Sequence, residues 1–222
     1  EKNLYQVGAK RDDYMGFSPH PTDSNTFFSS GHPSSGGNIG FQRSEDGGFS
    51  WKKISNGLNG PVDFHAMAVS PVDPNVVYGW FQGNLQKSVD GGTSWEQQPA
   101  DFVVVHLAAD TKDASVIYAS SPQGFYRSAD GGISWKQLFD GFVSTSAVNP
   151  KDQSILSASE KYGLARSEDG GATWAPIPER FGGATPLFIS YYRADPNLVY
   201  LLTHTNSLYK SINKGETWSK VK

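Results

Sequence analysis

The residues best suited to chemistry in this sequence are a few histidines and aspartates. His32 lies between a glycine and a proline, and His65 lies two residues after Asp63. His204 and Asp13 add one more imidazole and one more carboxylate elsewhere in the chain. Imidazole nitrogens and carboxylate oxygens bind divalent transition-metal ions, and a pair of facing carboxylates can cleave a glycosidic bond. Which of these side chains meet depends on the elements that carry them.

An eight-residue phrase that ends in tryptophan occurs five times, and its starting serines are 39 to 44 residues apart. Its pattern is Ser-x-Asp-x-Gly-x-(Ser/Thr)-Trp, and we name it the turn motif. The five copies begin at Ser44, Ser88, Ser128, Ser167 and Ser211. Repeats of this length are typical of solenoids and propeller blades. The spacing therefore indicates a repeat protein.

The turn motif has the pattern of a β-hairpin, because a short apolar-alternating run enters it and another leaves through the tryptophan. Its third residue can accept hydrogen bonds from backbone N–H groups of the same turn, and the glycine at its fifth position allows positive φ. The tryptophan is expected to pack between neighbouring sheets. We interpret the third-position residues as structural: Asp46, Asp90, Asp130, Asp169 and Asn213. Lys214 replaces a glycine in the last copy, which predicts a slightly different backbone there.

Each repeat also contains two further strands before its turn motif. An example is the apolar run ending at Pro71, an Asp-Pro-Asn turn, and the β-branched run 76–80. Four antiparallel strands per repeat predict an all-β fold, a β-propeller formed as a single domain over residues 1–222. The predicted blades span 14–57, 58–100, 101–141, 142–181 and 182–222. Residues 1–13 are predicted to be the outer strand of a preceding blade, which would give six blades in the natural protein. The alternative is a five-bladed ring with this strand on an outer edge.

In a propeller, the starts of the first strands and the ends of the second strands share one face, which we name the top face. Ligands usually bind there. The residues that this alignment places on the top face form the predicted ligand site: Asp13, His32, Asp63, His65, Gln82 and His204. A divalent metal could bind there through His32, His65 and His204, with Asp13 or Asp63 as the carboxylate. Alternatively, each histidine bonds a neighbouring loop carbonyl and fills space near the central channel.

The turn motif resembles the Asp-box, also called the BNR repeat, of sialidases, xyloglucan-cleaving hydrolases, sortilin-type receptors and photosystem II assembly factors. More narrowly, the segments 13–17, 30–33 and 63–67 resemble an uncharacterised group of exported bacterial proteins labelled BNR-repeat glycosyl hydrolases. This resemblance implies an exported propeller that is secreted, periplasmic or lipid-anchored. It implies hydrolysis less firmly, because one fold carries many functions.

We therefore expect a non-catalytic, extracytoplasmic propeller that binds a carbohydrate or protein ligand through its top face. The alternative is a glycoside hydrolase that uses Asp13 and Asp63 as its carboxylate pair. The sequence lacks the Arg-Ile-Pro motif typical of sialidases. Trp80 has no tryptophan counterpart in the other repeats, and it is a candidate sugar-stacking platform if its ring is exposed.

Composition excludes several classes of function. The formal net charge is −3 and no basic run occurs, so nucleic acid is not an expected partner. Cysteine is absent, which excludes disulfides and cysteine metal sites. The sequence contains no apolar stretch long enough for a membrane span and no signal-peptide pattern.

Overall fold

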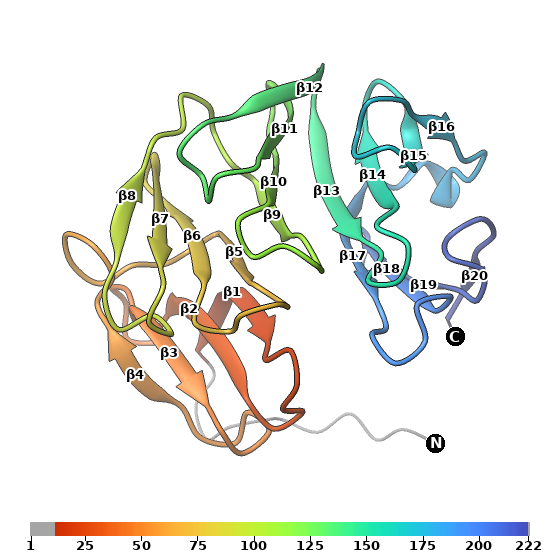
Figure 1. Ribbon diagram of the computed structural model, residues 1–222. Helices are drawn as coiled ribbons and strands as arrows, with labels where there is room; N and C mark the ends of the chain where they lie inside the picture. The colour runs from red at the N-terminus through yellow and green to blue at the C-terminus, as the bar shows by residue number, and fades with distance from the viewer. Residues whose placement is uncertain (1–11, 222) are drawn as a thin grey trace. The chain divides into compact units, whose positions relative to one another are not determined.

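Twenty strands form five four-stranded antiparallel sheets in the computed structural model, which describes residues 12–221 (Figure 1). In every sheet the neighbouring strands follow one another in the sequence. The prediction of an all-β propeller with five four-stranded blades is confirmed. The predicted outer strand of a preceding blade falls mainly on residues 1–11, which lie outside the described part. The chain divides into two compact units, one ending at Pro99 and the other beginning at Ala100.

The first unit contains two blades. The strands of the first blade are β1 (Asp13–Pro19), β2 (Phe27–His32), β3 (Phe41–Ser44) and β4 (Lys52–Ser55). Those of the second blade are β5 (Ala66–Val69), β6 (Val77–Phe81), β7 (Asn84–Ser88) and β8 (Glu96–Gln98). Strands β1 and β5 pack against each other. Their approach needs Gly16, because a Cβ there would lie 2.6 Å from the carbonyl oxygen of Phe64.

The second unit contains three blades. The third blade comprises β9 (His106–Ala109), β10 (Ile117–Ser120), β11 (Gly124–Ser128) and β12 (Lys136–Asp140). The fourth comprises β13 (Val143–Val148), β14 (Ile155–Ser159), β15 (Gly163–Ser167) and β16 (Ala175–Pro176). A 3₁₀ helix, η1 (Phe181–Gly183), precedes the fifth, which comprises β17 (Pro186–Tyr191), β18 (Val199–Thr203), β19 (Leu208–Ser211) and β20 (Ser219–Lys220).

The turn motif closes the hairpin between the third and fourth strands of each blade. In the second blade, Asp90 Oδ1 accepts the Ser94 N–H at 2.9 Å, and Oδ2 accepts the Ser94 hydroxyl at 2.6 Å. The buried N–H of Gly92 bonds the Ser88 hydroxyl instead, at 2.8 Å. The first serine therefore satisfies the buried donor, and the aspartate satisfies exposed ones. The sequence predicts the role of the aspartate but not that of the serine.

The glycines at the fourth and fifth positions of the turn motif both have positive φ, for example 71° at Gly91 and 87° at Gly92. The fifth-position φ values confirm the prediction made for that glycine. Lys214, at the fourth position of the last copy, has a φ of 59° and so adopts the same left-handed region. The predicted change of backbone at Lys214 is therefore wrong, because the turn hydrogen bonds of Ser211 and Asn213 hold this residue in the same conformation as the glycines.

Tryptophans of the turn motif pack between neighbouring blades where both blades belong to one unit. Trp95 of the second blade contacts Phe41 of the first, with ring centroids 5.2 Å apart. Trp174 of the fourth blade contacts Phe125 and Phe139 of the third at 5.7 and 5.3 Å. Trp80 does not serve as an exposed platform, because its side chain is buried within strand β6. The sugar-stacking hypothesis for Trp80 is therefore dropped.

Candidate functional site

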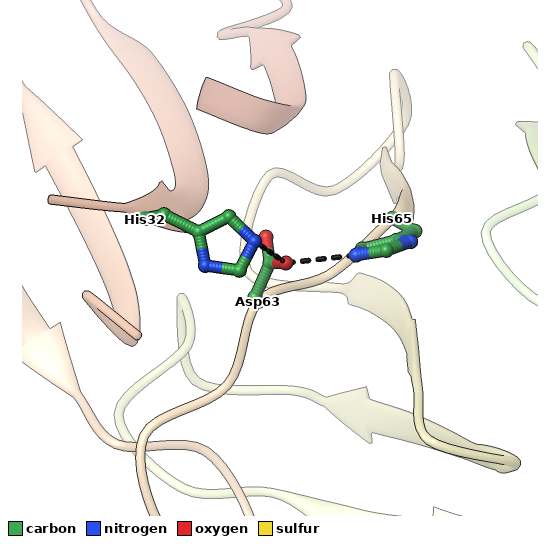
Figure 2. A group of neighbouring side chains, drawn as sticks. All are labelled: His32, Asp63 and His65. Carbon is green, nitrogen blue, oxygen red and sulfur yellow. Dashed lines mark hydrogen bonds and ion pairs between the residues drawn. The ribbon is translucent and has the colours of Figure 1, made fainter. Parts of the chain in front are cut away.

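Asp63 lies at the centre of a cluster with two imidazole rings. Its Oδ2 atom is 2.8 Å from Nε2 of His32 and 2.8 Å from Nε2 of His65. Figure 2 shows the two rings on opposite sides of this carboxylate. The Asp63 side chain has no exposed surface, whereas the side chains of His32 and His65 are 45% and 60% exposed. The cluster thus presents two accessible rings on a buried anion.

The backbone around Asp63 is fixed by strand β2 and the chain that follows it. The Ser30 hydroxyl donates to the Val62 carbonyl at 3.2 Å and accepts the Phe64 N–H at 2.9 Å. The Gly40 N–H donates to the same Val62 carbonyl at 2.9 Å. The residues on both sides of Asp63 are therefore tied to the first blade, which holds its carboxylate beneath the end of β2.

His32 is positioned by its neighbours in the first blade. It is the last residue of β2, directly opposite Asp13 in the pairing of β1 with β2. A Cβ on Gly31 would lie 1.8 Å from the Asp13 carbonyl oxygen, so only glycine fits before His32. On the other side, His32 Nδ1 is 3.2 Å from the Gly37 carbonyl oxygen. The Ser34 N–H donates to Asp12 Oδ1 at 3.0 Å, which anchors the loop that carries Gly37.

The other predicted site residues lie at comparable strand ends but are not in this cluster. Asp13 is exposed at the start of β1. Gln82 is exposed in the turn after β6, with a φ of 48°, and its carbonyl accepts a hydrogen bond from Asn84 at 3.0 Å. His204 lies in the second unit, where its Nδ1 accepts the Thr185 N–H at 3.0 Å. The structure thus brings together three of the six predicted residues.

The two remaining histidines have separate environments. His20 lies in the turn after β1, and its Nδ1 accepts the N–H groups of Thr22 and Asp23 at 3.3 and 3.1 Å. His106 begins β9, where its ring packs edge-on against Phe188. Burial lowers the pKa of His106 to about 4, and its Nδ1 has no hydrogen-bond partner in the described part of the chain. His106 is therefore held as a neutral ring.

The second unit has a hollow of about 440 Å³ at the corresponding strand ends of the fourth and fifth blades. Its lining includes Phe142, Ser144, Glu160, Arg180, Phe181 and Pro186. These residues come from the start of the first strand, the end of the second strand, and the loop that contains η1. The sequence pattern did not indicate this hollow, because the loop that contains η1 is not part of the repeated pattern. Among the described residues, no helix is long and apolar enough to span a membrane.

No family model matches the sequence, and no curated protein is similar to it. Solved structures are similar at the level of the fold. The xyloglucanase of family GH74 from Xanthomonas campestris matches 94% of this chain, with 15% identity and a TM-score of 0.65. A GH74 enzyme from Niastella koreensis matches 93%, with 15% identity and a TM-score of 0.70. This chain spans 45% and 38% of those two proteins, respectively.

A third similar structure is YCF48 bound to D1 peptide, which matches 97% of this chain with 17% identity and a TM-score of 0.62. In this case the match spans 70% of the other protein. At identities this low the likeness concerns the fold, and a shared fold does not establish a shared activity. The comparisons therefore support a β-propeller, in agreement with the blades described above.

Proposed function

We propose that this protein is a non-catalytic propeller of the Asp-box type that binds a protein or carbohydrate ligand at the edge carrying His32, Asp63 and His65. The observation that carries the proposal is the contrast in exposure within this cluster. Two accessible imidazoles are held on a carboxylate that has no exposed surface. Rigidly supported polar groups at a surface are suited to binding, because little conformational freedom is lost when a ligand docks.

The same geometry argues against a hydrolase that uses Asp13 and Asp63. A glycosidase needs two carboxyl groups that reach the scissile bond from either side. Asp63 is covered, and its Oδ2 contacts both histidine rings. A sugar could reach this oxygen only if both rings moved away.

The similar structures agree with either class of ligand. YCF48 is described with a bound D1 peptide, and the Xanthomonas enzyme is described as a xyloglucanase. We propose an extracytoplasmic location on the resemblance to exported BNR-repeat proteins, and fractionation of the source cells would test it.

The test is a binding survey of labelled protein on a glycan array and a peptide array. Binding should be lost in His32→Ala and His65→Ala and kept in His20→Ala, a histidine at the other end of β1. Parallel assays with reporter glycosides should show no turnover. Turnover that disappears in Asp63→Asn would replace the binding proposal with a hydrolase.

A further inference from the structure

We propose that His32, Asp63 and His65 form a binding centre for one divalent transition-metal ion. This inference rests on the proposed function, since the ion would present its open positions to a ligand at the same edge. The three residues each offer one ligand atom, and these atoms all lie within 4.8 Å of one another. They come from two neighbouring segments of the first unit, the end of β2 and the chain leading into β5.

The first argument is the state of the Asp63 carboxylate. The side chain is fully buried, and its Oδ1 atom has no hydrogen-bond partner among residues 12–221. Its Oδ2 atom contacts the two histidine rings. A buried carboxylate needs a compensating cation or a complete set of donors, since its transfer from water is costly. The ion pairs found for Asp63 are both with histidine, which is a cation only when protonated. A bound metal ion would supply the missing charge.

The second argument is the orientation of the His32 ring. Its Nδ1 faces the Gly37 carbonyl oxygen, which can only accept a hydrogen bond, so Nδ1 carries the proton. In a neutral ring, Nε2 then has a lone pair, yet it lies 2.8 Å from a carboxylate oxygen. Two lone pairs at that distance repel unless a proton or a metal ion lies between them. A histidine that donates one ring N–H to a backbone carbonyl and directs the other nitrogen at a metal is the common arrangement in metal sites.

The third argument is distance. Nitrogen and oxygen ligands lie about 2 Å from a zinc-like ion, so two neighbouring ligand atoms are about 3 to 3.5 Å apart. The Nε2 atoms of His32 and His65 are each 2.8 Å from Asp63 Oδ2. Each contact would therefore lengthen by about half an ångström when an ion entered. The exposed side chains of both histidines allow that movement.

The donor set selects the class of ion. Two imidazoles and one carboxylate suit zinc, copper, iron or nickel better than calcium or magnesium, which prefer oxygen ligands. Three protein ligands leave at least one coordination position open on a four- to six-coordinate ion. An oxygen atom of water or of a bound ligand can take that position.

The experiment uses the full chain, freed of any histidine tag, with Zn²⁺ for calorimetry and Cu²⁺ for electron paramagnetic resonance. We expect one Zn²⁺ per chain and a copper spectrum with hyperfine structure from two imidazole nitrogens. His65→Ala should weaken Zn²⁺ binding by more than the about 10- to 100-fold typical of losing an outer-sphere partner. Its copper spectrum should retain the coupling of one imidazole at most. His20→Ala and His204→Ala, which remove a half-buried and an exposed histidine outside the cluster, should bind as the parent does.

Absence of stoichiometric binding, or unchanged binding in His32→Ala and His65→Ala, would overturn the metal centre. Because His65 is exposed, loss of its side chain should leave the fold intact, which a circular dichroism melt verifies. The array experiment, repeated with and without a chelator, separates the two proposals. If the titration shows no metal binding and the arrays still show ligand binding with the chelator present, the proposed ligand site is kept and the metal centre is rejected.

Discussion

Replacing Ser88 with alanine tests the assignment of roles within the turn motif. The Ser88 hydroxyl is buried, accepts the N–H of Gly92 at 2.8 Å, and donates to Asp90 Oδ1 at 2.8 Å. Alanine removes the only acceptor that the described residues offer this buried N–H, whereas Asp90 keeps both of its bonds to Ser94. A buried donor left without a partner costs about 1 to 3 kcal/mol. For a domain of this size, each kcal/mol corresponds to about 2 to 4 °C in Tm.

The matched control is Ser94→Ala in the same motif. That hydroxyl donates to Asp90 Oδ2 at 2.6 Å in an exposed position, where water can replace it. Thermal melts and urea titrations of both variants should show the larger loss for Ser88→Ala. An equal or larger loss for Ser94→Ala would mean that the serine does not hold the buried part of the turn.

Three further predictions concern packing and titration. Trp95→Ala should cost about 3 to 5 kcal/mol in urea titrations, because the ring packs on Phe41 and Phe64; a loss below 1 kcal/mol would contradict that packing. Hydrogen bonds from Ser134 and Ser128 lower the pKa of Asp130 to about 2, so its stabilising effect is complete above pH 4 and lost as the pH falls toward 2. Asp130→Asn should therefore lose less stability than the parent across that interval, and equal losses would refute the shift. Burial lowers the pKa of His106 to about 4 in the folded protein. As the pH falls, the unfolded chain therefore takes up this proton before the folded protein does, and the free energy of unfolding should decrease from pH 6.5 toward pH 4. His106→Leu should flatten this part of the stability profile, and an unchanged slope would show that the ring is not buried.

Much of the fold could be predicted because each repeat contains residues that mark the positions of its turns. The serine and tryptophan of the turn motif mark one hairpin, and turns such as Asp73-Pro-Asn75 mark another through side-chain bonds within the turn. The prediction for Lys214 is wrong because the left-handed region is not confined to glycine in this turn. At this position the hydrogen bonds of Ser211 and Asn213 offset the steric preference of a lysine. The hypothesis of an exposed Trp80 is wrong because β6 is buried at its first four positions and is therefore covered on both faces. The absence of a tryptophan at this position in the other repeats does not indicate whether the ring is exposed.

The candidate site could be predicted in part for a similar reason. Repeat alignment placed His32, Asp63 and His65 at equivalent strand ends, and these residues meet in the structure. The contact of His32 with Gly37 could not be predicted from the repeats, because the long connection between β2 and β3 occurs in the first blade alone among the described blades. It also treated Asp13 and Asp63 as a matched pair, although one is exposed and the other fully covered. Burial of that kind depends on the chain between neighbouring blades, which varies among the repeats.

The direction in which the turn-motif tryptophans point has a consequence for how such chains can lengthen. Trp95 sits in the last hairpin of its own blade but fills a space beside Phe41 of the blade before it, and Trp174 does the same beside Phe125. These two copies therefore each carry the group that fastens their blade to the preceding one. A duplicated stretch of about forty residues would contain its own turn-motif tryptophan for packing on the preceding blade, and it would leave the contacts of that blade intact. A blade could then be gained by tandem duplication without the evolution of a new interface.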